Sequence, residues 1–479
     1  MKLHLLPYAL ATAVLFMSNA VGQNAIDLGS KRELFVDHFL VDKLDGVQLK
    51  LQTPRPGGVA IRYDGPAEGK FCFYTTVFQD GDLYRMYYRG QIGKEWTQSV
   101  TCYAESRDGI VWTKPALGLV EINGSKANNA ILPVGKQFCP FVDRKPDIPK
   151  SERYKANMEA GPGLTGWVSA DGIHWRQIEP VPLVARKLSN HFDSQNVIFW
   201  SETEWQYLLY CRHMEGGRRA TARATSPDFK TWSPPVLMAY SDTGTTTPSQ
   251  HLYTNQTHPY FRAPHIFISL PGRFHPGRRV LTKEQERQIA PDSGGGAAND
   301  IADGVLLTSR AGTTRYDFTF RESFVRPGIG YSNWTSRNNY PALGVVATGP
   351  AEMSMYVQRN YAQDTAYLER MTLRLDGFAS ANAGADGGEL ITKLLVFDGK
   401  ELAINYSTSA AGEVRVEIQD AAGRAIPGFS LQDCPAIIGD QIERVVAWKA
   451  GSDVRKLSGQ PVRLLFRLQD ADLFSLRFK

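Results

Sequence analysis

Three acidic segments of the chain carry side chains that suit acid/base chemistry. They are Tyr63-Asp64-Gly-Pro-Ala-Glu68-Gly69, the segment ending in Asp143, and the segment with Asp193 directly before the apolar run Val197–Trp200. Cleavage of a glycosidic bond needs one carboxylic acid to protonate the leaving oxygen and one carboxylate as nucleophile or base. A third acid adjusts the pKa values of the other two by charge repulsion. We therefore expect Asp143, Asp193 and either Asp64 or Glu68 to be catalytic.

A second group of side chains has the hydrogen-bonding and aromatic character of a sugar-binding surface. Residues 253–265 are rich in such side chains, and Arg262 and His265 within them also suit an anionic group on a sugar. The residues expected to bind substrate are Gln195, Asn196, Asn255, His258, Arg262, His265, Arg337 and Tyr356.

Each of these residues also has a structural interpretation, because acids at strand ends accept backbone hydrogen bonds and buried polar groups brace turns. Two other functions fit the same residues. One is a carbohydrate-binding protein without catalysis. The other is a phosphorolytic enzyme in which Arg262, His265 and Arg337 hold phosphate in place of attacking water.

A repeated turn defines the scaffold that must position these side chains. It occurs as Ser106-Arg-Asp-Gly-Ile-Val-Trp112, Ser169-Ala-Asp-Gly-Ile-His-Trp175, Ser226-Pro-Asp-Phe-Lys-Thr-Trp232 and, degraded, Ser309–Tyr316. The serines are 63, 57 and 83 residues apart, a spacing typical of four-stranded units with variable loops. We interpret Asp108, Asp171 and Asp228 as turn residues and predict β-hairpin modules that close into a β-propeller.

The expected fold is all-β, with a five-bladed β-propeller over residues 30–378, a linker over 379–389 and a β-sandwich over 390–479. The five units drafted from alternating strands are 59–114, 138–178, 191–232, 252–320 and 338–378. In a propeller the first strand of each blade borders a central funnel, so polar residues at blade starts should converge there.

Bulk properties limit the remaining possibilities. Residues 1–22 have the layout of a secretory signal peptide, and no later stretch has the length of a membrane span, so an exported protein is expected. A net charge of +5 with scattered Lys and Arg gives no indication of nucleic-acid binding. The five cysteines have no metal-ligand spacing, and a Cys72–Cys102 bridge or free thiols both fit. We expect no metal and no cofactor, and leave a structural calcium ion open.

The segments Tyr63-Asp64-Gly-Pro66, Val142-Asp143-Arg144 and Phe192-Asp193-Ser194, with the repeated turns, resemble the five-bladed propeller glycosidases of glycoside hydrolase families 32, 43, 68 and 130. Invertase-like members carry Asn-Asp-Pro-Asn, Arg-Asp-Pro and Glu-Cys there, so no motif is intact and the third acid is Asp instead of Glu. The resemblance implies Asp64 or Glu68 as nucleophile or base, Asp143 as transition-state stabiliser or pKa modulator, and Asp193 as general acid on a carbohydrate substrate.

Overall fold

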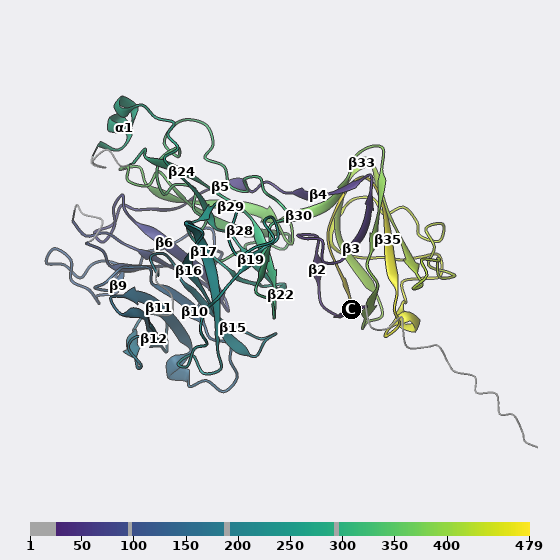
Figure 1. Ribbon diagram of the computed structural model, residues 1–479, viewed down its shortest axis with the longest axis horizontal. Coiled ribbons are helices and arrows are strands. Elements are labelled where there is room, and N and C mark those ends of the chain that lie inside the picture. The colour runs from purple at the N-terminus through teal and green to yellow at the C-terminus, as the bar shows by residue number, and fades with distance from the viewer. Residues whose placement is uncertain (1–24, 94–97, 186–191, 292–296) are drawn as a thin grey trace, which may run out of the picture.

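The computed structural model describes residues 25–93, 98–185, 192–291 and 297–479. The expected signal peptide, residues 1–22, lies outside the described residues. Strands dominate, and the described helices are α1 (Lys283–Ile289) and the 3-10 turns η2 (Lys150–Glu152) and η5 (Arg455–Leu457). None of the described helices is long and apolar enough to cross a membrane. Figure 1 shows the strands gathered into two bodies, and the chain crosses between them at residues 51–55 and 374–379.

The first body contains five antiparallel or mixed sheets of four or five strands. The first sheet is β6 (Phe73–Asp80), β7 (Leu83–Arg89), β8 (Thr101–Ser106) and β9 (Ala130–Leu132). The second is β10 (Cys139–Val142), β11 (Tyr154–Ala160), β12 (Gly163–Ser169), β13 (Arg176–Ile178) and β14 (Val184–Ala185). The third is β15 (Val197–Ser201), β16 (Gln206–Glu215), β17 (Arg218–Ser226) and β18 (Val236–Leu237). The fourth is β21 (His258–Tyr260), β22 (Ala263–Ser269), β25 (Leu307–Arg310), β26 (Arg315–Asp317) and β19 (Ala239–Tyr240). The fifth is β27 (Val346–Ala347), β28 (Glu352–Arg359), β29 (Tyr367–Arg374) and β5 (Arg55–Arg62).

The fifth sheet joins two distant parts of the chain. Strand β5 precedes the first sheet in sequence, yet it pairs with β29 and forms the outer edge of the last sheet. Residues 59–62 were expected at the start of the first unit (59–114), but they lie in β5 and so belong to the fifth sheet. The first strands of neighbouring sheets contact one another, β6 with β10 and β27, and β15 with β10 and β21, so the first strands follow each other around a common axis.

The repeated turns have the structural role that the sequence predicts. Asp108 Oδ1 accepts hydrogen bonds from the backbone N–H groups of Ile110 (2.7 Å) and Val111 (2.9 Å), and Ser106 Oγ accepts one from Gly109 (2.9 Å). The two bonds to the aspartate recur at Asp171 and Asp228. These backbone donors, with His174 at Asp171, lower the pKa of all three carboxyls despite their partial desolvation.

An additional small sheet and α1 lie on one side of the first body, and most of this addition falls between β22 and β25 in the sequence. The small sheet is β20 (His251–Leu252), β23 (Gly272–Pro276) and β24 (Asp300–Gly304). Helix α1 begins with a capping box between Thr282 and Gln285.

The second body contains an eight-stranded sheet and a parallel pair of strands. The sheet is β2 (Glu33–Leu34), β3 (Val41–Asp45), β4 (Val47–Leu51), β30 (Ala379–Ala383), β31 (Gly388–Thr392), β33 (Leu402–Gln419), β34 (Asp440–Val445) and β35 (Arg463–Phe478), and the pair is β1 (Ile26–Gly29) with β32 (Leu395–Phe397). The expected domain boundaries differ from this arrangement. Residues 26–51 were expected in the propeller from residue 30 onward, but they belong to the second body, where β4 pairs with β30. Strand β30 itself lies within the expected linker, residues 379–389. The next strand after β4, β5, pairs with β29 in the first body.

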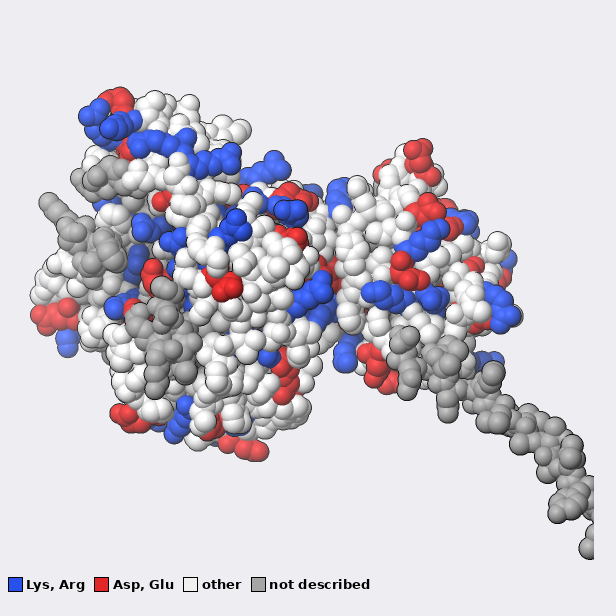
Figure 2. Space-filling view, viewed as in Figure 1, with Lys and Arg blue, Asp and Glu red and all other residues white. Residues whose placement is uncertain are grey.

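The two bodies meet through a buried ionic network. Asp376 is fully buried and lies 3.3 Å from Arg32 and 3.0 Å from Arg262, and Glu443 accepts from the same two arginines. Figure 2 shows blue and red side chains next to each other at this junction, and otherwise a mixed distribution of charge over the visible face. All five cysteines are buried free thiols, so Cys72 and Cys102 form no bridge.

Candidate functional site

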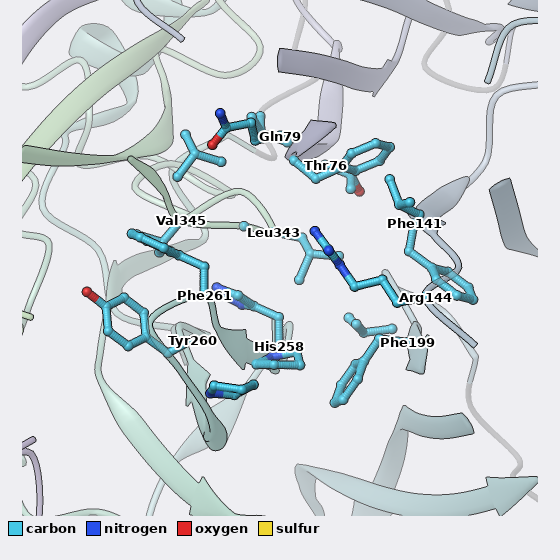
Figure 3. A pocket seen from close by; sticks show the side chains of 18 of the residues that line it. Thr76, Gln79, Phe141, Arg144, Phe199, His258, Tyr260, Phe261, Leu343 and Val345 are labelled. Atoms are coloured by element: carbon cyan, nitrogen blue, oxygen red, sulfur yellow. The ribbon is translucent and has the colours of Figure 1, made fainter. Parts of the chain in front are cut away.

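A cavity of about 510 Å³ follows the axis around which the five sheets are arranged. Residues from the first strands of all five sheets line it, and most are apolar, such as Phe141 and Phe199 (Figure 3). Figure 3 shows the side chain of Arg144 reaching into the middle of this cavity. The size suits a small ligand, but none of the predicted catalytic acids lines it.

His258 is the predicted substrate-binding residue that borders this cavity. Its Nδ1 lies 2.9 Å from the carbonyl oxygen of Gln256, so Nδ1 carries the proton and donates it. Burial lowers the pKa of His258 to about 4. The imidazole is therefore neutral at pH 7.

Buried amides connect four of the sheets at the axis. Gln195 donates to Thr76 Oγ1 (2.7 Å) and accepts from Gln256 (2.9 Å), which also donates to the carbonyl of Pro341 (3.1 Å). Asn196 and Asn255 are likewise buried, and Asn255 donates to the carbonyl oxygen of Tyr210. These predicted binding residues stabilise the arrangement of the sheets, since their amide groups are engaged within the protein.

A group of cationic and aromatic side chains lies on β6, β7, β16 and β17 and in the segments around residues 253, 337 and 361. We call it the Arg–Tyr cluster, and it consists of Arg89, Arg212, Arg219, Arg337, Tyr74, Tyr253 and Tyr361. Strand pairing explains part of it. Met214 is directly opposite Arg219 on the β16–β17 ladder, so Arg212, two residues before Met214, shares that face with Arg219.

Tyr253 lies at the centre of the cluster. The guanidinium of Arg212 is 4.5 Å from its ring centroid and that of Arg219 is 5.0 Å away. Arg337 interacts with the Tyr253 hydroxyl and lies 5.8 Å from the ring of Tyr361.

Arg89 joins the cluster from β7. Its guanidinium lies 5.2 Å from the ring of Tyr74 and donates to the Tyr361 hydroxyl at 3.3 Å. The three tyrosines are buried, whereas Arg337 is exposed, so the cluster opens to solvent on the Arg337 side.

Two carboxyl groups border the Arg–Tyr cluster. Asp193 is exposed and lies close to Tyr74, whose pKa is raised by burial, by Tyr253 and by this carboxylate. Asp300, the first residue of β24, accepts a hydrogen bond from Ser336 Oγ at 3.0 Å. Burial raises the pKa of Asp300, and Ser336, Arg337 and Arg219 offset only part of that increase. Asp193 is thus exposed to solvent, whereas the surroundings of Asp300 raise its pKa.

The other predicted catalytic acids lie elsewhere and are neutralised by lysines. Lys114 contacts Asp64 at 2.7 Å and Glu68 at 2.8 Å, and Glu68, whose side chain is fully buried, also accepts from Tyr88. The contact with Lys114 lowers the pKa of Asp64.

The side chain of Asp143 is also fully buried and lies 2.7 Å from Lys155 and 2.6 Å from the Tyr207 hydroxyl. Among the described residues, none of these partners of Asp143 contacts Glu68 or Asp193. The structure therefore does not bring the predicted acids together in one site.

Three predicted binding residues also lie away from the Arg–Tyr cluster. Arg262 and His265 contact Asp376 and Glu33 at the junction of the two bodies, so their charges are already compensated there. Tyr356 is buried and donates to the carbonyl oxygen of Gly109 in the first repeated turn. Arg337 is the predicted binding residue that lies in the cluster.

The sequence pattern does not single out Asp300, three of the arginines, Tyr74 or Tyr361, whereas Tyr253 begins the run 253–265 that is expected to bind a sugar. Asp300 ends the Gly/Ala-rich segment 291–300, whose composition indicates only a loop. The arginines stand inside or at the ends of strands that alternation does identify, and an inspection of cations on the β16–β17 hairpin would have found Arg212 and Arg219.

Within the described residues no group of three or more His, Cys, Asp or Glu side chains could hold a metal ion. No family model matches the sequence, and no curated protein matches it significantly.

Three solved structures resemble the chain at low identity. An N-acetylgalactosamine deacetylase from F. plautii, in complex with blood group B trisaccharide, is 11% identical with a TM-score of 0.43 and covers 69% of this chain and 96% of its own. A structure from a study of the GH130 mannoside phosphorylase family, which contains hydrolases of β-1,2-mannosidic linkages in Candida mannan, is 14% identical (TM-score 0.40; 71% and 96% covered). The catalytic domain of the Coprinopsis cinerea GH62 α-L-arabinofuranosidase is 9% identical (TM-score 0.42; 68% and 97%). All three are named for carbohydrates, but these identities and TM-scores are too low to assign an activity.

Proposed function

We propose that the protein hydrolyses a glycosidic bond at the Arg–Tyr cluster, with Asp300 as general acid and Asp193 as the second carboxylate. The observation that carries this proposal is that two carboxyl groups border the same aromatic and cationic cluster in different surroundings. Asp300 is partly buried and Asp193 is exposed. Pairs of titratable groups whose environments differ in this way are typical of acid/base sites.

The chemistry follows from these environments. Asp300, whose pKa is raised by burial, can protonate the leaving oxygen of the scissile bond. Asp193 can act as nucleophile, or remove a proton from the attacking water. The rings and guanidinium groups between them offer stacking faces and N–H donors to a sugar.

We further propose that the two bodies are a propeller and an accessory domain. The five sheets are the blades of a five-bladed propeller that β5 closes, and the second body is an accessory β-sandwich. The signal-like residues 1–22 direct export, which suits an enzyme that acts on an extracellular poly- or oligosaccharide.

Carbohydrate binding without catalysis is the second candidate. It is favoured by the ion pairs of Glu68 and Asp143, which occupy two of the acids that the resemblance assigns to catalysis. It predicts sugar binding at the cluster without product formation.

Release of reducing ends from a panel of polysaccharides, with purified protein, separates the two candidates. Asp193→Asn and Asp300→Asn should each lower turnover by about 100-fold or more, because acid/base groups contribute that much. Asp64→Asn is the control, since Asp64 is exposed and paired with Lys114, and it should retain activity. Full activity in both Asp193→Asn and Asp300→Asn would refute the assignment.

A further inference from the structure

The Arg–Tyr cluster has more positive than negative charge. It gathers Arg89, Arg219 and Arg337 next to Arg212, and the bordering acids are Asp193 and Asp300. Among the residues that the structure describes, no carboxylate lies within 4.0 Å of the guanidinium nitrogens of Arg89, Arg219 or Arg337.

Three other arginines of the same strands and sheets are paired with carboxylates. Arg223, four residues after Arg219 on β17, forms an ion pair with Glu204. Arg359 in the fifth sheet lies 2.7 Å from Glu369, and Arg273 in the small sheet pairs with Asp303. Arg89, Arg219 and Arg337 differ from these three arginines because they have no carboxylate at that distance among the described residues.

Aromatic rings and neutral acceptors hold the guanidinium groups in place without neutralising them. Arg219 lies 5.0 Å from the ring of Tyr253 and 4.8 Å from that of Phe274, and its Nη1 is 3.4 Å from His251 Nδ1. Burial and the nearby arginines lower the pKa of His251, so this imidazole adds no charge of its own at pH 7. The buried Nε atoms of Arg89 and Arg219 have no hydrogen-bond partner among the described atoms.

Planar guanidinium groups with free N–H donors bind oxyanions through paired hydrogen bonds. We propose that the carbohydrate substrate carries an anionic group, a carboxylate or a sulfate ester, which binds to Arg219 and Arg337. This proposal rests on the cluster being the site of the proposed function.

An anion at this position would also act on the neighbouring acid. Arg219 and Arg337 are the charges that lower the pKa of Asp300, so an anion bound to them would weaken their effect. The bound substrate would thereby favour the protonated state that a general acid requires.

Matched polymers test the proposal, because each pair shares a backbone and differs in its anionic groups. The probes are polygalacturonate with its methyl ester and chondroitin sulfate with its desulfated form, in affinity electrophoresis and calorimetry together with reducing-end assays. Wild-type protein should bind at least one charged polymer at least about tenfold more tightly than its less charged partner. Arg219→Gln and Arg337→Gln should remove that preference, whereas Arg337→Lys should retain part of it.

Arg218→Gln is the matched control, because Arg218 precedes Arg219 on β17 and its side chain is engaged by the carbonyl oxygen of Pro248. It should bind like the wild type, and thermal melts should show that all variants are folded. Binding to none of the charged polymers, or binding that both glutamine variants retain, overturns the proposal. Dependence of turnover on inorganic phosphate, with a sugar phosphate as product, also overturns it, because the arginines would then serve a free anion.

The assays separate this proposal from the proposed function. Arginine-dependent binding of a charged polymer without cleavage supports the anionic ligand and contradicts hydrolysis. Asp300-dependent cleavage of a neutral polymer, without binding of charged ones, supports hydrolysis and overturns the anionic ligand.

Discussion

Replacing Asp143 by asparagine should destabilise the protein and leave its turnover intact. The Asp143 carboxylate is fully buried, and the side chain of its partner Lys155, at 2.7 Å, is 5% exposed. Removal of one partner from a buried ion pair costs about 3–5 kcal/mol, because the other charge remains uncompensated.

The structure indicates the lower end of that range. Glu152 lies 3.7 Å from Lys155 and remains as a partial partner, and the single carbonyl oxygen of an asparagine can still accept either from Tyr207 or from the backbone N–H of Lys145. We expect the free energy of unfolding to fall by about 3 kcal/mol.

Urea unfolding followed by tryptophan fluorescence measures this loss. Asp64→Asn is the exposed control and should cost less than about 1 kcal/mol. Combining Asp143→Asn with Lys155→Met should recover most of the loss, since no unpaired charge remains. An Asp143→Asn protein that keeps wild-type stability but loses turnover would refute this reasoning and support a catalytic Asp143.

Two further predictions concern the cavity and the repeated turns. His258 has a pKa of about 4 in the folded protein against an ordinary value of 6.5, so the unfolded chain binds its proton first. Stability should therefore fall as the pH falls from about 6.5 to 4, by up to roughly 3 kcal/mol, and His258→Gln should remove this contribution in urea titrations at pH 7 and 4.5. Gly172→Ala should lower stability by more than about 1 kcal/mol, because Gly172 has φ 78° and a Cβ would lie 2.7 Å from the Tyr87 hydroxyl. Gly161→Ala is the control for thermal melts, since a Cβ at Gly161 would meet open space, and equal losses at both positions would contradict the explanation.

The sequence predicts the repeated turns because their hydrogen bonds are local. The backbone N–H groups that bind Asp108 follow it by two and three residues, so composition alone identifies the motif. Strand alternation likewise locates the sheets, since each is built mainly from neighbouring hairpins. The pairing of β5 with β29 cannot be predicted in this way. The two strands are about 300 residues apart, and a local sequence pattern does not indicate which distant strand will pair.

The candidate site is harder to predict for the same reason. Glu68 has the appearance of a catalytic acid until Lys114, far along the chain, is found beside it. Asp300 has the appearance of a loop residue until burial and Ser336 give it a distinct environment. Arg262 and His265 were interpreted as ligands for an anion, and their partners come from residues 376 and 33.

The pH dependence of kcat/KM for wild type and Asp300→Asn, on a polysaccharide that the wild type cleaves, tests the central claim most directly. A general acid must be protonated, so wild-type activity should fall as the pH rises through the raised pKa of Asp300. Asp300→Asn should show at least about 100-fold lower activity without this decline. An Asp300→Asn protein with the activity and pH profile of the wild type would contradict the account.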